Sequence, residues 1–234
     1  MGFFVVGQLN NVKTLHKYLS YIVRIVVEES SSPYNEKLIV AIQDGKYVLN
    51  TSNANYSFGS LHRVFQKAFR HIRLNKRNFS SCLLLGGGAG SIPVILYKEL
   101  GLDINTTVVE IDSEVIRLGK KYFNTENHQN LSWINEDALL FVEKATTNFD
   151  LIAIDLFKDI TVPEHFCKQA FIQQIKNILS PKGVLLFNFV VYNKQSRQQF
   201  EQLVAAVEKV FQNNYTLQVL TLESMNKMLV VEAK

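Results

Sequence analysis

Residues 83–91, Leu-Leu-Leu-Gly-Gly-Gly-Ala-Gly-Ser, are an apolar run followed by a glycine-rich segment. The apolar run predicts a buried strand. The glycines predict a tight loop that can approach a ligand closely, because glycine has no side chain. The helix expected next, over residues 90–100, offers backbone N–H groups without partners in the helix and a positive dipole end. The stretch therefore predicts a ligand site where a strand passes into a helix.

A second apolar run, residues 106–111, carries a carboxylate near its end. This is Glu110, which lies 20 positions after Gly90 and could accept hydrogen bonds from both ribose hydroxyls of a nucleoside. The loop spacing is G-x-G-x-G, whereas a dinucleotide fingerprint would need glycine at position 91, where this chain has Ser91. The spacing resembles the first motif of the S-adenosylmethionine-dependent transferases. A turn that binds nothing is the simpler alternative, and Glu110 argues against it.

Length and composition are those of an ordinary globular protein. The 234 residues suit one domain of average size with a small appendage, and 47% are hydrophobic while 20% are charged. No apolar run is long enough to span a membrane, and the N-terminus has no signal-peptide pattern, so we expect a cytoplasmic protein without a membrane partner. Cys82 and Cys167 lack metal-ligand spacing, the five histidines show no paired spacing in the sequence, and we expect no metal.

Strand and helix patterns alternate from residue 83 onward, which predicts a parallel sheet covered on both faces. The expected strands are 83–86, 106–111, 131–135, 150–155 and 184–190, and the expected helices are 90–100, 113–123, 137–145, 164–179 and 194–211. Residues 215–221 and 227–232 have no helix between them, so we expect an antiparallel pair at the sheet edge. The predicted fold is α/β, a seven-stranded, mostly parallel, doubly wound sheet of the class I methyltransferase-like Rossmann type.

The first 76 residues have a different pattern and predict a small β-strand region plus a linking helix, with residues 77–234 as the nucleoside-binding catalytic domain. Short strands are expected at residues 1–6, 21–27, 38–43 and 47–49, with Asp44-Gly45 as a hairpin turn. Residues 57–75 have apolar side chains at helical spacing. The other side of this helix carries Arg63, Lys67, Arg70, Arg73, Lys76 and Arg77. These cations could bind RNA, although a solvated face is favoured because no aromatic residue lies among them.

The order of motifs resembles the spermidine synthase (aminopropyltransferase) family over roughly residues 80–190. The motifs are the glycine loop, Val109-Glu110-Ile111-Asp112, Asn135-Glu136-Asp137-Ala138 and Asp150-Leu151-Ile152-Ala153-Ile154-Asp155. The resemblance implies that Glu110 binds the ribose, that Asp137 accepts the adenine amino group, and that Asp155 is the catalytic aspartate. The implied cofactor-binding set is Gly86, Gly88, Gly90, Glu110, Ile111, Asp137, Ala138 and Asp155. Asp137 could instead only cap the following helix, and capping is the favoured role for Asp112.

The chain departs from this family where the polyamine would bind. Asp155-Leu156-Phe157-Lys158-Asp159-Ile160 has a lysine in place of a second carboxylate, and Ala89 replaces an aspartate of the glycine loop. A cationic polyamine needs several carboxylates, so the acceptor is a small molecule, expected to be an amine, that the sequence does not identify.

The resemblance implies a transferase of polyamine biosynthesis that uses S-adenosylmethionine or decarboxylated S-adenosylmethionine and moves a methyl or an aminopropyl group. Alternatives are a non-catalytic nucleoside-binding module, an RNA methyltransferase using the basic helix and, least favoured, a dinucleotide oxidoreductase. A homodimer is left open.

Overall fold

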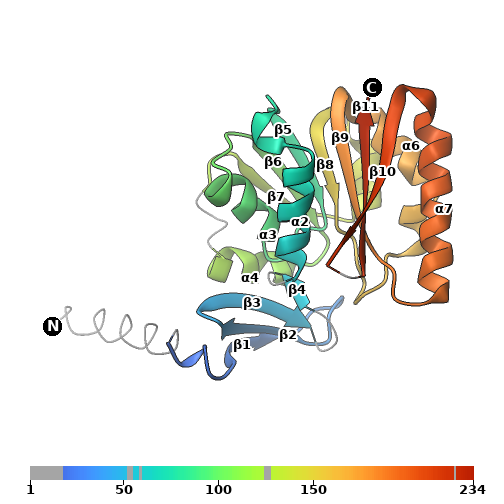
Figure 1. Cartoon of the computed structure of the whole chain (residues 1–234). Helices are drawn as coiled ribbons and strands as arrows, with labels where there is room; N and C mark the ends of the chain where they lie inside the picture. The colour runs from blue at the N-terminus through green and yellow to red at the C-terminus, as the bar shows by residue number, and fades with distance from the viewer. Residues whose placement is uncertain (1–17, 52–54, 58–59, 124–127, 224) are drawn as a thin grey trace.

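A seven-stranded sheet forms the centre of the larger part of the molecule (Figure 1). The computed structural model describes residues 18–51, 55–57, 60–123, 128–223 and 225–234. The sheet order is β10-β11-β9-β8-β5-β6-β7. Its strands are β5 (Ser81–Leu85), β6 (Asn105–Glu110), β7 (Leu131–Asn135), β8 (Phe149–Ile154), β9 (Leu179–Val190), β10 (Tyr215–Leu222) and β11 (Asn226–Ala233). Strands β5 to β9 pair in parallel, and β10 and β11 are antiparallel. The predicted fold class is confirmed.

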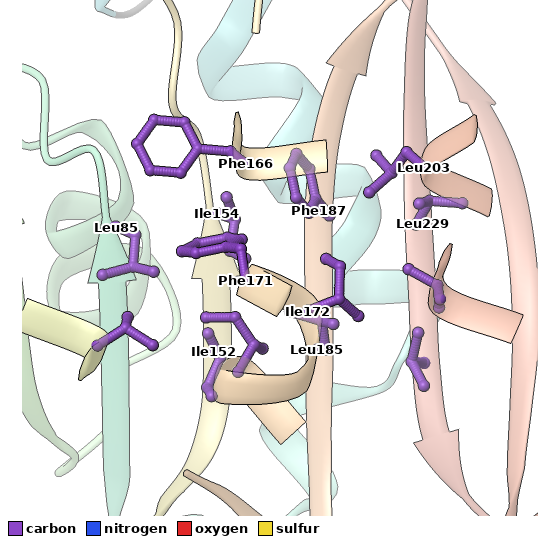
Figure 2. Close-up of a cluster of buried hydrophobic side chains, with 14 of the residues drawn as sticks. Leu85, Ile152, Ile154, Phe166, Phe171, Ile172, Leu185, Phe187, Leu203 and Leu229 are labelled. Carbon is purple, nitrogen blue, oxygen red and sulfur yellow. The ribbon is translucent and has the colours of Figure 1, made fainter. Parts of the chain in front are cut away.

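Helices cover both faces of this sheet because its strands are apolar on both sides. On one face, α2 (Ser60–His71) and α3 (Ser91–Val94) pack over Leu84, Ala153 and Leu186. On the other face, α5 (Ala138–Lys144), α6 (Gln169–Asn177) and α7 (Lys194–Phe211) contribute to a second core. Figure 2 shows part of that second core, a buried cluster that extends from Leu85 through Ile154, Phe171 and Phe187 to Leu203. The helix α4 (Ser113–Phe123) follows β6.

Two of the helices predicted after residue 83 are each divided into two segments. The helix expected at 90–100 is α3 followed by a π-helical segment, Ile95–Glu99, and Pro93 lies in its first turn, where no N–H is needed. The helix expected at 164–179 is divided into a 3₁₀ segment, Glu164–Cys167, and α6. Lys168 between them is extended, with ψ of 149°, which ends the first segment.

The N-terminal region is an antiparallel sheet of four strands in chain order among the described residues. They are β1 (Ile25–Ser30), β2 (Leu38–Gln43), β3 (Lys46–Thr51) and β4 (Asn55–Ser57). Asp44 and Gly45 both have positive φ, 49° and 73°, as the predicted two-residue hairpin turn requires. The strand expected from Tyr21 begins only at Ile25, because the preceding backbone bonds locally to Leu19. The strand expected at residues 1–6 lies outside the described residues.

This small sheet packs against the glycine loop and α4 of the larger part. Leu38, Val40 and Leu49 form one buried cluster with Ala89 and with residues of α4, among them Leu118. Polar contacts reinforce the packing at two places: Ser32 and Asn35 donate to Asp112, and Glu28 pairs with Arg117 and Lys121. The N-terminal sheet therefore helps to fix the segment that follows β6, where the candidate site lies.

Candidate nucleoside and catalytic site

The glycine loop joins β5 to α3 and leaves no room for a side chain at Gly86 or Gly87. Gly86 has φ of 86°, and a Cβ on it would lie 2.3 Å from the carbonyl oxygen of Asp155. A Cβ on Gly87 would lie 2.3 Å from Val108 and 2.6 Å from Trp133. Gly88 and Gly90 also have positive φ, 49° and 94°, which glycine adopts at little cost. The loop is therefore held directly against β6, β7 and the residue that follows β8.

Glu110 is the last residue of β6, and its carboxylate lies against the glycine loop. Its Oε2 accepts a hydrogen bond from the Gly88 N–H at 3.0 Å, and its Oε1 accepts one from the Asp112 N–H at 3.0 Å. The residue is only 4% exposed, and burial raises its pKa from 4.5 to about 7. A carboxylate has about four lone-pair positions, and the backbone of Gly87 also interacts with this one, so it keeps some capacity for another donor. These contacts fit a group that both braces the loop and accepts ribose hydroxyls.

Asp137 caps α5 in the structure. Its Oδ1 accepts from the backbone N–H of Leu139 at 2.8 Å and of Leu140 at 3.3 Å. Ala138 is buried, and Ile111 is half-buried beside Glu110. The cap uses one carboxylate oxygen, which leaves Oδ2 to serve an adenine amino group, so the two roles proposed for Asp137 are compatible.

Asn135 and Asp112 have contacts that the sequence did not predict. The Asn135 side chain donates to the carbonyl oxygens of Glu110 and Ile111, at 2.9 and 2.8 Å, and so fastens the end of β7 to the end of β6. Asp112 accepts from the Glu114 N–H at 2.9 Å, which is the helix cap expected of it. It also accepts from Ser32 and Asn35 of the N-terminal sheet, and no sequence pattern signals that pairing.

Asp155 follows β8 and lies next to the point where β5 passes into the glycine loop. Its N–H donates to the Leu85 carbonyl at 2.8 Å, and its carbonyl group lies in close contact with Gly86. The Asp155 backbone is therefore held against the end of β5. The side chain is half-buried, and burial raises its pKa from 3.8 to about 7. The Asn188 side chain donates to its Oδ1 at 2.8 Å, which opposes that rise. A carboxyl group with this pKa can exchange a proton near neutral pH.

The segment after Asp155 forms a tight turn that carries Lys158. The backbone groups of Lys158 and Thr161 bond to each other in both directions, at 2.9 and 3.1 Å, and Asp159 within the turn has φ of 56°. Both Lys158 and Asp159 are exposed. Thr161 is linked at 3.1 Å to the hydroxyl of Tyr192, just before α7. An exposed cation thus lies on the turn next to the candidate catalytic carboxylate.

The basic side of α2, together with the basic residues that follow it up to Arg77, is partly neutralised. Glu223 pairs with Arg63 at 3.0 Å and with Lys67 at 2.6 Å, and Glu232 pairs with Arg77 at 2.8 Å. Arg70, Arg73 and Lys76 are exposed. Half of the predicted basic stripe therefore has carboxylate partners within the protein.

The described residues contain neither a metal-binding cluster nor a helix suited to span a membrane. Within them, no group of three or more His, Cys, Asp and Glu side chains is arranged to hold a metal ion. Across the same residues, no helix has both the length and the apolar character needed to span a membrane.

The sheet order and the pairing of the glycine loop with Glu110 define a protein of the class I methyltransferase-like fold. The crystal structure of spermidine synthase from Thermotoga maritima superposes with a TM-score of 0.70 at 16% identity, covering 90% of this chain and 73% of that chain. Residues 62–234 match the spermine/spermidine synthase domain, and the chain belongs to this family.

Two kinds of transferase appear among the relatives of this chain. It is 32% identical over 109 residues to the polyamine aminopropyltransferase of Vibrio vulnificus, covering 45% of this chain and 36% of that protein. It is 28% identical over 126 residues to the eEF1A lysine and N-terminal methyltransferase homolog of Drosophila melanogaster, covering 50% of this chain and 19% of that protein. The matches span from 31% to 49% of the length of the first polyamine aminopropyltransferase relatives.

Proposed function

We propose that the chain is a spermidine synthase-like transferase that takes a methyl or aminopropyl group from a sulfonium donor and moves it to an amine. The donor is S-adenosylmethionine or its decarboxylated form. The observation that carries the proposal is Asp155, a half-buried carboxyl group with a pKa of about 7 whose backbone lies against Gly86 of the glycine loop. Family membership supports the donor class.

The proposed step is an in-line displacement at the carbon attached to sulfur. The lone pair of the acceptor nitrogen forms the new N–C bond, the C–S bond breaks, and the sulfur leaves as a neutral thioether. The proton lost by the nitrogen passes to Asp155, which must be ionised beforehand. A pKa of about 7 makes the ionised form available near neutral pH while leaving the group basic enough to take the proton. Positioning supplies the rest of the rate enhancement.

The acceptor pocket is proposed to differ from that of a polyamine synthase. Lys158 stands on the turn after Asp155 where the family resemblance implies a second carboxylate, and it is exposed at this position. A cation here repels the distal ammonium of putrescine or spermidine instead of binding it. We therefore expect a monoamine, or an amine that also carries an anionic group, to be a better acceptor than a diamine.

Methyl transfer is the second candidate, because one group of relatives consists of protein methyltransferases. The discriminating assay offers the purified protein each donor in turn with a panel of amines and identifies products by mass. Product mass shows which group is transferred. Efficient aminopropyl transfer to putrescine, with kcat/KM of about 10⁴ M⁻¹s⁻¹ or more, would contradict the role assigned to Lys158.

Asp155→Asn tests the catalytic role. The amide is nearly the same size but cannot take the proton, so kcat should fall by roughly 10² to 10⁴ while the affinity for methylthioadenosine stays within a few-fold. Asp150→Asn is the matched control: Asp150 lies on β8, the strand that Asp155 follows, but it bonds to Ser80 and Ser81 away from the glycine loop. Near-normal turnover of Asp155→Asn would refute the mechanism. Binding of methylthioadenosine without turnover of any acceptor would favour the non-catalytic module.

A further inference from the structure

Asn188 is a buried polar residue in a strand segment that is otherwise apolar. It is 0% exposed, and its neighbours in β9, Leu186, Phe187 and Phe189, are buried in the hydrophobic cores. A buried amide costs free energy unless its donor and acceptor are both satisfied. Both are satisfied here: Nδ2 donates to Oδ1 of Asp155 at 2.8 Å, and Oδ1 accepts from the Asn226 side chain at 3.0 Å.

Strand register explains why these three side chains meet. Leu85, Ile154 and Phe187 are cross-strand neighbours on β5, β8 and β9, so Gly86, Asp155 and Asn188 occupy the next row toward the ligand edge. On the other side, Asn226 pairs with Val190, two residues after Asn188, and is therefore its diagonal neighbour on the same face. A polar row thus runs from the glycine loop across β8 and β9 to β11.

We propose that Asn188 is a positioning residue for Asp155 and that Asn226 fixes the orientation of its amide. Because Asn226 donates to the Asn188 oxygen, the Asn188 N–H is directed at Asp155. Oδ1 of Asp155 is thereby occupied, and Oδ2 is the oxygen that faces an incoming amine. The inference extends the proposed function, since it states how the catalytic carboxylate of that proposal is held.

Apart from Asp155 itself, no charged side chain in the described residues takes part in this row. The neighbours of Asp155 on β5 and β9 are Gly86 and Asn188, and the nearby cation Lys158 is exposed on the following turn. Lys227, next to Asn226, donates instead to Thr221 at 2.7 Å. Burial and the Asn188 hydrogen bond are the two influences on the pKa of Asp155, and they act in opposite directions. Loss of the Asn188 amide should therefore raise that pKa.

The test measures the titration of Asp155 directly, by NMR of protein labelled with ¹³C at aspartate carboxyl carbons. The Asp155 signal is assigned by its loss in Asp155→Asn. Asn188→Leu removes the amide while keeping a similar volume, and its Asp155 midpoint should rise by about one pH unit or more. Asn226→Leu should give a smaller rise, because the Asn188 amide remains but is no longer held. Asn130→Ala is the matched control. The Asn130 side chain also donates to an aspartate, Asp103, but these two residues precede β7 and β6 and are not part of the Asp155 row. The variant should leave Asp155 unchanged.

An unchanged Asp155 midpoint in folded Asn188→Leu would overturn the inference. If that variant does not fold, Asn226→Leu decides it, because Asn226 is only half-buried at the start of β11; an unchanged midpoint there would equally overturn it. Once an acceptor is known, the acidic limb of the kcat–pH profile should move upward by the same amount as the midpoint. Absence of turnover by the wild-type chain would count against the proposed function alone, since the titration needs no substrate.

Discussion

The buried carboxyl group of Glu110 should make the stability of this protein decrease as the pH rises. The folded protein holds the Glu110 proton up to a pKa of about 7, whereas the ordinary pKa is 4.5. Between these values the folded state binds more protons than the unfolded state, so the free energy of unfolding falls as pH increases. The full stability contribution is present below the lower value and is lost as the pH passes through the higher one.

The size of the effect follows from the same two values. Each pH unit between them costs about 1.4 kcal/mol, and the interval from about pH 5 to about pH 7 therefore costs about 3 kcal/mol. Glu110→Gln removes this dependence because an amide does not titrate. The variant also has one acceptor oxygen for two backbone N–H groups, Gly88 and Asp112, which costs about 1–2 kcal/mol at any pH. Glu110→Gln should thus be less stable than the wild type near pH 5 and more stable near pH 8.

Urea unfolding of both proteins at intervals from about pH 5 to about pH 8 checks this expectation. The difference in free energy of unfolding between the two proteins isolates Glu110, because other titrating groups, Asp155 among them, are present in both. The difference should change sign across the series. A difference that stays constant with pH would refute the reasoning and would show that Glu110 is ionised in the folded protein throughout.

Three further outcomes test other parts of the molecule. Asp137→Asn should keep the melting temperature but weaken binding of adenosine ligands. Asp137→Ala should weaken binding and also cost about 1 kcal/mol of stability through the lost helix cap. Equal ligand affinity in the wild type and both variants would show that Asp137 acts only as a helix cap. Asp112→Ala should cost about 2–3 kcal/mol in urea unfolding, because its buried carboxylate accepts from Ser32, Asn35 and the Glu114 N–H, and a cost under about 0.5 kcal/mol would contradict that. If the exposed cations of α2 bind RNA, affinity in a filter-binding assay should fall steeply with salt, and salt-insensitive or undetectable binding would support the solvated face.

The sequence predicted the sheet and the helices well because its local patterns and its tertiary structure agree. The strand at 131–135 and the helices at 113–123 and 194–211 have the observed bounds. Their apolar periodicity is the same property that buries them in the core. The division of the helix at Lys168 has no such local signal, and neither does the local bonding to Leu19 that delays the strand expected from Tyr21 until Ile25.

Prediction of the candidate site was limited by long-range contacts. The positions of Glu110 and Asp155 follow from their places at strand ends, since parallel strands end at one edge of a sheet. The contacts of Asn188 and of Asp112 depend on register between distant strands and on the packing of the N-terminal sheet. For the contact between Asn188 and Asp155, the signal available in the sequence was a lone asparagine within the apolar run 184–191. The second pairing joins residues 80 positions apart, and a single sequence does not specify it.

The attachment of the N-terminal sheet to Asp112 has a consequence for how the protein opens. Asp112 follows Glu110 by two residues, and the Glu110 carboxylate accepts a hydrogen bond from the Asp112 N–H. A displacement of the N-terminal sheet therefore also displaces residues 110–112, whose Glu110 bonds to the glycine loop. The apolar cluster around Ala89 joins the same two parts. Amide hydrogens of β2 and of the glycine loop should therefore exchange with solvent as one cooperative unit, with similar opening free energies. A nucleoside bound at the loop would then slow exchange in β2 as well as in the loop.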